Sequence, residues 1–347
     1  MTFLEALILW ILKKLKSERS VYAVFHLIKG KKSSQTIQDA YLYQIKALFY
    51  TFPYLKRSDF DECIQSLINK GLLEVKENNQ YFLTNKGVEQ INAFFSNYSF
   101  PSFLNGMKYQ EQPFIIWNRL CILIQVLSNL VHDSRLYYPI TRDTKLLRWV
   151  RQFILSQKMT KHQLGEAIYN ELYTIFSKNP PESPEMFVYR LTGYNQIGKT
   201  VEQTADKLSM ETTEYWFRFL HLLHYVVEQV LGNRHSYPIL FSIMQDIDEP
   251  FPMTKSTVET YKLLLKNYTI SEISKIRNLK ESTIQDHIIE IALNNPEFSI
   301  RTFIDSDTEE KIMRIAKRMG KQKLKLIKEQ LEGVSYFHIR LALAKNR

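Results

Sequence analysis

The stretch from Ser256 to Asn295 constrains the fold most strongly, because its spacing predicts short helices joined by a tight turn. Thr269 and Glu272 stand three positions apart, the spacing at which each side chain accepts a hydrogen bond from the other residue's backbone amide at a helix start. Asn278 comes nine positions after Thr269 and tolerates the left-handed conformation that a tight turn needs. We expect a further helix from about Thr283. This order of elements predicts a helix-turn-helix.

Apolar residues in this stretch recur at helical spacing, which predicts one buried face on each helix. We expect the inner faces of the first two helices to consist of Val258, Tyr261, Leu264, Leu265, Ile270, Ile273 and Ile276. Leu279 would fill the turn, and Ile284, Ile288 and Ile291 would continue the inner face in the third helix.

The third helix is the one that enters the DNA groove in a DNA-reading helix-turn-helix, but its predicted outer face is acidic. Glu281, Asp286 and Glu290 would repel phosphates, and Lys280 stands where a capping serine is expected. Side chains suited to base contacts are Ser282, Thr283 and Gln285. The module can therefore read DNA or dock a protein, since a fold does not fix its function.

Positive charge is concentrated at the two ends of the chain. The formal net charge is +10 and the isoelectric point about 9.3, while the middle of the chain is close to neutral. The basic clusters are Lys13, Lys14, Lys16, Lys29, Lys31 and Lys32 near the start, and Lys311, Arg314, Lys317, Arg318, Lys321, Lys323, Lys325 and Lys328 near the end. Such clusters suit phosphate contacts, or they are solvated helix faces. The predicted DNA-binding residues are Lys31, Lys32, Lys280, Gln285, His287, Lys317, Arg318, Lys321 and Lys323.

The first hundred residues have the pattern of a winged helix. Helices are expected at 3–16, 18–28 and 36–50, and a further one is expected to be capped by Ser58 and to end at Gly71. A hairpin should follow, with Leu73 and Val75 on one strand and a turn at 77–80. The helix expected after Ser58 also carries acids near its start, Asp59, Asp61 and Glu62, so it is no obvious reader of DNA.

These patterns predict a mainly α protein with three parts. They are an amino-terminal winged helix with a short β-hairpin (1–98), a central helical domain with a weaker helix-turn-helix (113–231) and a carboxy-terminal helix-turn-helix domain (255–347). Proline-containing connectors lie at 96–112 and 232–254. Cys63 and Cys121 stand far apart, which fits a reducing cytoplasm. No stretch is expected to approach the roughly 18 apolar residues of a membrane span, so no membrane partner is expected.

Residues 193–200, GYNQIGKT, satisfy the formal phosphate-loop pattern. The mechanism of that loop needs a buried strand before it and a carboxylate on a second strand, and the surrounding sequence shows no such alternation. We therefore interpret Thr200 as a helix cap, paired with Gln203. His221 and His224 lie one turn apart without a third ligand at useful spacing, which indicates packing rather than zinc. No cofactor is predicted.

Both ends of the chain resemble one known family. The carboxy-terminal elements TISEIS, LKESTIQDHI and KLKLIKEQLEGVSYFHIRLALA resemble the helix-turn-helix module that closes many bacterial RecQ-type helicases. The segment KGKKSSQTIQDAYLYQIKALFYTFPYLKRSDF resembles the free-standing YpbB-like proteins of Firmicutes, which carry that module without a helicase core.

The resemblance implies a non-catalytic partner or regulator of a RecQ-type helicase, and the basic surfaces add DNA as a second partner. Three other functions stay open at this point. A sequence-specific transcription regulator would need a basic, exposed recognition helix. A pure protein-interaction scaffold would show no salt-sensitive DNA binding. A phosphate-loop enzyme would bind ATP through Lys199.

Overall fold

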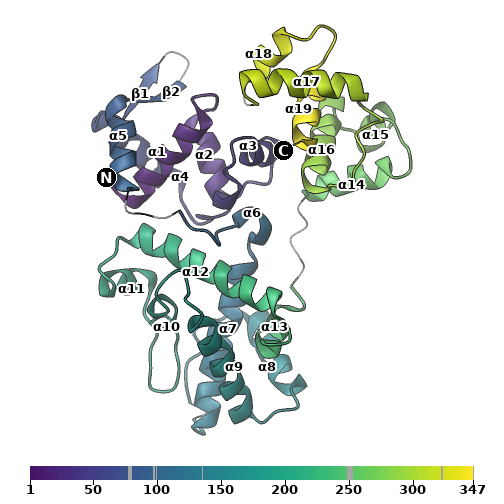
Figure 1. Cartoon of the computed structure of the whole chain (residues 1–347). Helices are drawn as coiled ribbons and strands as arrows, with labels where there is room; N and C mark the ends of the chain where they lie inside the picture. Colours follow the sequence, from purple (N-terminus) through teal and green to yellow (C-terminus); the bar gives the residue numbers. More distant parts are fainter. Residues whose placement is uncertain are drawn as a thin grey trace. The chain divides into compact units, whose positions relative to one another are not determined.

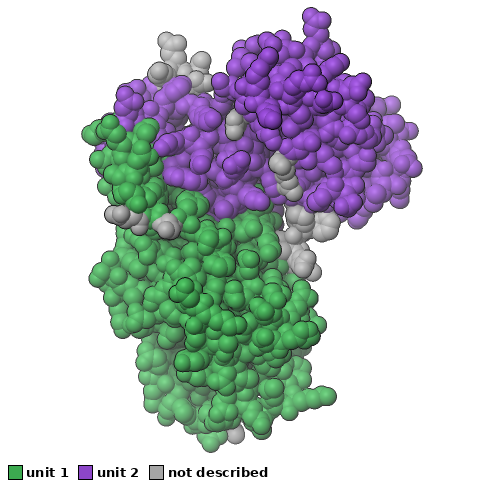
Figure 2. Space-filling view, viewed as in Figure 1, with its two compact units in different colours: residues 1–9, 86–250 green, residues 10–85, 251–347 purple. Residues whose placement is uncertain are grey.

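A computed structural model gives the fold of the chain, and it describes residues 1–347 except 77–79, 97, 99, 135, 248–252, 322 and 347. The described chain is mainly helical with one short antiparallel β-hairpin, as predicted (Figure 1). It divides into two compact units, each built from segments far apart in sequence (Figure 2). Unit 1 comprises residues 1–9 and 86–250, and unit 2 comprises residues 10–85 and 251–347. Whether residues 1–98, 113–231 and 255–347 fold independently stays a prediction.

Unit 1 is a helical assembly around a large apolar core. Its helices are α5 (Asn85–Phe94), α6 (Gly106–Tyr109), α7 (Gln112–Val131), α8 (Thr144–Ser156), α9 (Lys161–Phe176), α10 (Glu185–Val188), α11 (Val201–Lys207), α12 (Thr212–Gly232) and α13 (Pro238–Met244), together with the first turns of α1 (Phe3–Leu15). Helix α7 packs against α8, α9, α12 and α13, so it is the central helix of this unit.

Helix α7 corrects the expectation that no stretch approaches a membrane span. It has 20 residues and a mean hydropathy of 1.7, so its length and composition would allow it to span a membrane. Half of its most apolar window is buried inside the protein. Because the core helix of a globular unit meets the same criteria, this finding is weak evidence for a membrane.

Unit 2 joins the amino-terminal and carboxy-terminal segments. Its first half contains α2 (Val21–Lys29), α3 (Ser34–Leu42), the short 3-10 helix η1 (Lys46–Leu48), α4 (Arg57–Asn69), β1 (Leu73–Lys76) and β2 (Gln80–Leu83). Its second half contains α14 (Lys255–Leu264), α15 (Ile270–Arg277), α16 (Glu281–Asn294), α17 (Ser306–Met319), α18 (Leu324–Glu329) and α19 (Tyr336–Lys345).

The helix-then-hairpin order of the predicted winged helix is present. Gly71 adopts φ +65 after α4, as expected of a left-handed helix end, and Leu73 pairs with Leu83 across the hairpin. The predicted turn at 77–80 lies largely outside the described residues, as do Pro250 and Pro252 of the second connector.

Two local predictions in the first half of unit 2 were wrong. The helix expected over 36–50 ends at Leu42 and is followed by η1, because the chain turns at Gln44 with φ +56. Ser58 does not cap α4, since the helix already begins at Arg57 and the Ser58 hydroxyl donates to Asp59 instead.

Gly30 ends α2 and sets the direction of the chain that follows. It closes α2 with φ +76, and a Cβ built there would lie 2.0 Å from the Tyr50 ring. Both the left-handed backbone and the close ring require glycine. The tight end of α2 places Lys31 and Lys32 at the surface immediately after it, where both side chains are exposed.

Candidate nucleic-acid interface

The predicted helix-turn-helix forms as α14, α15 and α16. Thr269 and Glu272 make the capping box, with the Thr269 amide donating to the Glu272 carboxylate at 2.8 Å. Asn278 ends α15 in the left-handed conformation at φ 49 and ψ 47. Lys280 precedes α16 without capping it, as the sequence predicted. Thr269, Glu272 and Asn278, from which the turn was predicted, therefore also determine its geometry.

The inner faces of α14 and α15 were predicted only in part. Ile273 is fully buried as expected, but Leu265 is 66% exposed and Ile276 is 56% exposed. Thr257 and Thr260 are buried in α14 instead, because their hydroxyls meet polar groups of α16. The α14–α16 contact is consequently more polar than apolar periodicity alone indicated.

Helix α16, which occupies the position of a recognition helix, is a core helix here. It is packed by α14, α15 and α19, and α3 from the amino-terminal segment covers it as well (Figure 1). All its side chains from His287 to Leu293 are buried. Ile37 of α3 belongs to the same apolar cluster as Ile284 and Ile288. In this arrangement, the carboxy-terminal half of α16 cannot enter a DNA groove.

Glu290 was predicted to face outward, and that prediction was wrong. Its side chain is 0% exposed and accepts hydrogen bonds from the Thr254 amide and, at 2.8 Å, from the Thr257 hydroxyl. The Ser34 hydroxyl of α3 approaches it at 3.5 Å. Burial raises the pKa of Glu290 above its ordinary value, and these hydrogen bonds offset part of that rise. Glu290 therefore links α14, α16 and α3.

His287 was predicted to contact DNA, and its position excludes this. It is 5% exposed, and its Nδ1 atom lies 2.8 Å from the Thr260 hydroxyl. Burial and the nearby Arg277 guanidinium lower the pKa of His287 to about 4, so the ring is neutral at physiological pH. Arg277 also donates to the Ser256 carbonyl at 2.7 Å. These contacts fasten α14 and α15 to α16.

Asp286 is neutralised within the fold. Its carboxylate pairs with Arg340 of α19, and Arg340 also donates to Gln38 of α3 at 2.9 Å. Of the acidic residues expected to repel DNA, only Glu281 lies exposed on α16. Gln285 is half-buried, and the neighbouring Lys280 is exposed.

The remaining predicted DNA contacts lie at the end of α17 and in the segment after it. Lys317, Arg318 and Lys323 are exposed, whereas Lys321 is half-buried and donates from Nζ to the Asn346 carbonyl at 2.7 Å. Earlier in α17, Arg314 pairs with Glu310 at 3.1 Å. Of the four predicted contact residues here, Lys317, Arg318 and Lys323 are exposed and have no ion-pair partner among the described residues, and we call these three the α17 end. No contact in the described part of unit 2 joins them to Lys31 or Lys32.

A pocket of about 720 Å³ lies in unit 2 where α3 meets the carboxy-terminal helices. Leu293, Leu324 and Leu343 contribute apolar wall, and Lys46 and Lys321 contribute positive charge. Arg19 and Arg340 also line the pocket, but they are paired with Asp39 and Asp286. Tyr336 is half exposed at its wall. A segment that carries apolar and acidic side chains matches this lining.

The phosphate-loop pattern has none of the geometry that phosphate binding needs. The chain before it forms the helix α10 rather than a strand. A Cβ at Gly198 would lie 2.4 Å from the Arg190 carbonyl, so this glycine serves close backbone packing. Thr200 caps α11 in a capping box with Gln203, as predicted. The loop is a structural turn in front of a helix.

His221 and His224 are packing residues that accept hydrogen bonds from backbone amides. The Phe103 amide donates to Nε2 of His221 at 3.2 Å, and the Asn105 amide donates to Nδ1 of His224 at 3.0 Å. Complete burial lowers the pKa of His224 to about 3. Within the described residues, no group of three potential metal ligands comes together.

Comparison with known proteins places the chain in a family. A family model described as a helix-turn-helix domain matches residues 256–343. Protein YpbB of Bacillus subtilis (strain 168) is 34% identical over 352 aligned residues, which cover 99% of this chain and 98% of YpbB. The chain belongs to the YpbB family. No solved structure matches it. The resemblance of both ends to YpbB-like proteins is thereby confirmed, and no catalytic domain is indicated in this YpbB-like chain.

Sequence reasoning missed one basic surface, on α8 of unit 1. Lys145, Arg148 and Arg151 are exposed there. Averaging charge over the whole middle region concealed them, because acids elsewhere in that region balance them. A shorter window finds the signal, since no Asp or Glu occurs between residues 144 and 165.

Proposed function

We propose that this YpbB-family protein is a non-catalytic accessory factor of a RecQ-family DNA helicase. The observation that carries the proposal is the helix-turn-helix domain at residues 256–343, whose elements TISEIS and LKESTIQDHI resemble the module that closes RecQ-type helicases. The burial of the carboxy-terminal half of α16 and the exposed acidic Glu281 at its start support a docking role for the module over base reading. The α17 end and Lys31–Lys32 supply exposed cations for phosphate contact. The proposed location is the cytoplasm, without a membrane partner.

The helicase is proposed to bind at the pocket beside α3. Its apolar walls and its basic groups suit a helicase segment that carries apolar and acidic residues. We expect the double variant K46E/Y336A to lose most of the cognate RecQ helicase recovered by the wild-type chain in a pull-down from purified components. Both side chains are exposed, so the fold should persist.

The matched control for that pull-down is K266E/Y268A, which changes the same residue types at exposed positions between α14 and α15, outside the pocket. It should recover as much helicase as the wild type. Failure of the wild-type chain to recover any helicase would reject the partner proposal. Equal recovery by K46E/Y336A would reject the pocket as the docking site.

DNA contact is proposed to run through the α17 end, without sequence preference. Two phosphate contacts contribute about 1.8 to the slope of log affinity against log salt on duplex DNA. K317Q/R318Q should therefore reduce that slope by about 1.8. Raising salt fourfold should then weaken the wild type about twelvefold more than the variant. Fluorescence anisotropy with a labelled duplex measures both values.

The charge-preserving variant K317R/R318K is the control, and its slope should equal that of the wild type. An unchanged slope in K317Q/R318Q would remove the α17 end from the interface. Salt-insensitive binding by the wild type, or no binding at low salt, would favour the second candidate, a pure protein-interaction scaffold. The burial of the carboxy-terminal half of α16, together with the acidic Glu281 at its exposed start, favours that candidate over a sequence-specific transcription regulator, whose recognition helix reads bases with its first turns.

A further inference from the structure

Helix α8 of unit 1 presents a cationic face without an ion-pair partner among the residues that the structure describes. Lys145, Arg148 and Arg151 are exposed on it. Among the described residues, no carboxylate pairs with any of the three, whereas Arg119 on the adjacent α7 and Arg218 on α12 do form ion pairs. The nearest acid in sequence, Asp143, is used as the helix cap and accepts from the Lys145 amide at 2.8 Å. The positive charge of this face is therefore uncompensated.

Packing fixes the direction of this face. Val150 and Phe153 on the opposite side of α8 are buried in the core of unit 1. Trp149 donates from Nε1 to Asp246 at 3.2 Å, and the Arg119 guanidinium lies over its ring. Helix α8 packs on α7 (Figure 1). These contacts hold the helix in one rotation, so the cations stay at the surface.

An exposed aromatic side chain stands just before this face. Tyr138 is 95% exposed although its backbone is held in place. The buried Gln125 of α7 donates to the Tyr138 carbonyl at 3.0 Å and accepts from the Ile140 amide at 3.0 Å. The buried Gln125 side chain therefore holds the backbone of residues 138–140 in place, while the Tyr138 ring is exposed to solvent. A phenol ring presented in this way is a surface on which an unpaired base can stack.

We propose that α8 and the segment before it bind single-stranded nucleic acid. Lys145, Arg148 and Arg151 contact successive phosphates, and Tyr138 stacks on a base. The three cations span about 9 Å along the helix axis, at 1.5 Å per residue. An unpaired strand fits better than a duplex because only unpaired bases expose a ring face to stack on.

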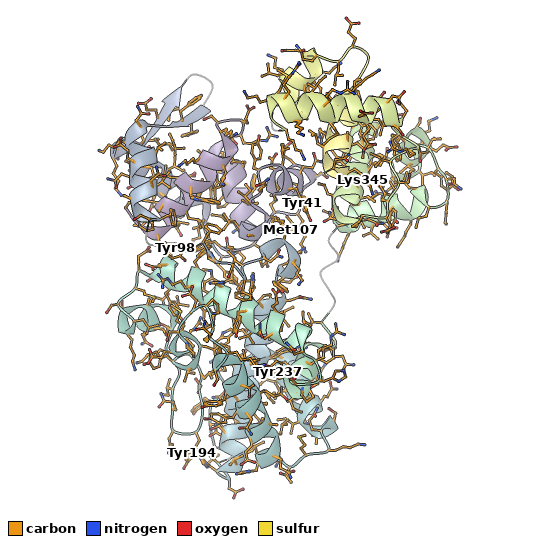
Figure 3. All side chains as sticks on the ribbon, in the orientation of Figure 1. Tyr41, Tyr98, Met107, Tyr194, Tyr237 and Lys345 are labelled. Carbon is orange, nitrogen blue, oxygen red and sulfur yellow. The ribbon has the colours of Figure 1, made fainter. Side chains whose placement is uncertain are left out.

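A membrane surface fits this face poorly. A helix that lies in a membrane interface turns its apolar side to the lipid. The apolar side of α8 is already buried in unit 1, with Leu146, Leu147 and Ile154 packed against the same core. Figure 3 labels Tyr237 of that core. The exposed side of α8 is cationic and polar, so it is complementary to phosphate groups.

The test compares the full chain with R148Q/R151Q and with Y138A, using labelled oligo(dT), a duplex of the same length and vesicles of anionic lipid. R148Q/R151Q should lower the salt slope on oligo(dT) by about 1.4, so that a fourfold rise in salt weakens the wild type about sevenfold more than the variant. Y138A should weaken oligo(dT) binding at least about fivefold, since one stacked base contributes that much or more, and it should change duplex binding little. The control K199Q/K207Q removes two cations from the α11 segment of unit 1 and should match the wild type.

This inference and the proposed function can fail separately. If K317Q/R318Q alters duplex binding while R148Q/R151Q leaves oligo(dT) binding unchanged, the α8 surface is rejected and the proposed function stands. Equal losses from Y138A on duplex and single strand would also overturn the proposal, as would tighter binding to vesicles than to oligo(dT). Loss confined to oligo(dT) in both α8 variants supports it.

Discussion

Replacing Ile37 with alanine is expected to lower the free energy of unfolding of unit 2 by about 3 kcal/mol. Ile37 lies on α3, near the start of the chain, but its side chain is buried in the apolar cluster of the carboxy-terminal helices. Truncation removes buried methyl groups and leaves a cavity beside α16. Urea unfolding followed by circular dichroism measures the change.

The matched control is Ile276→Ala, the same substitution at an exposed position of α15. It should change the free energy of unfolding by no more than about 0.5 kcal/mol. Hydrogen exchange adds a second readout, because Ile37→Ala should speed exchange in α16 although the two residues are far apart in sequence. Equal stability of the two variants would show that α3 does not pack on the carboxy-terminal core.

Replacing Glu290 with alanine should cost a similar amount, about 3 kcal/mol at pH 5. The carboxylate accepts from the Thr254 amide and the Thr257 hydroxyl in the interior. Its removal leaves two buried donors without an acceptor, and each such group costs about 1–3 kcal/mol. Glu281→Ala, an exposed change on the same helix, should be close to neutral. Losses of equal size in both variants would contradict the buried role of Glu290.

The pH dependence of stability follows from the raised pKa of Glu290. A carboxyl whose pKa is higher in the folded state binds its proton more tightly there than in the unfolded chain. Its contribution is therefore fully present below the unfolded pKa of about 4.5 and is lost as pH rises through the folded pKa. The stability of the wild type relative to Glu290→Gln should fall as pH rises from 4.5. A relative stability that rises over this range would mean that the folded pKa is lowered.

Sequence patterns predicted the local structure of the helix-turn-helix but not the environment of its third helix. The capping box of Thr269 and Glu272, the left-handed Asn278 and the strand pairs of the hairpin depend on neighbours in sequence, so spacing reveals them. Glu290 is approached by Ser34 of α3, 256 residues away in sequence, and His287 is packed by Thr260 and Arg277 of the two preceding helices. The pattern of apolar residues within α16 cannot indicate that α3, from a distant part of the sequence, packs on it.

The sequence predicts the exposed cations of the candidate interface where several basic residues stand close together in the chain. The exposure of Lys31, Lys32, Lys317 and Arg318 agrees with their place in lysine-rich stretches. Lys321 has a charged group engaged by the Asn346 carbonyl, a contact between segments that sequence spacing cannot indicate. The net charge of the middle region did not reveal the cations of α8, because acidic residues elsewhere in that region balance them.

The central claim is that α16 is a structural helix and that DNA contact runs through exposed cations on other elements. Hydrogen–deuterium exchange of the full chain, free and with saturating duplex DNA, tests it most directly. The backbone amides of residues 287–293 should exchange among the slowest in unit 2, and DNA should leave their rates unchanged. Rapid exchange of these amides in the free chain, followed by strong protection when DNA is added, would contradict the claim.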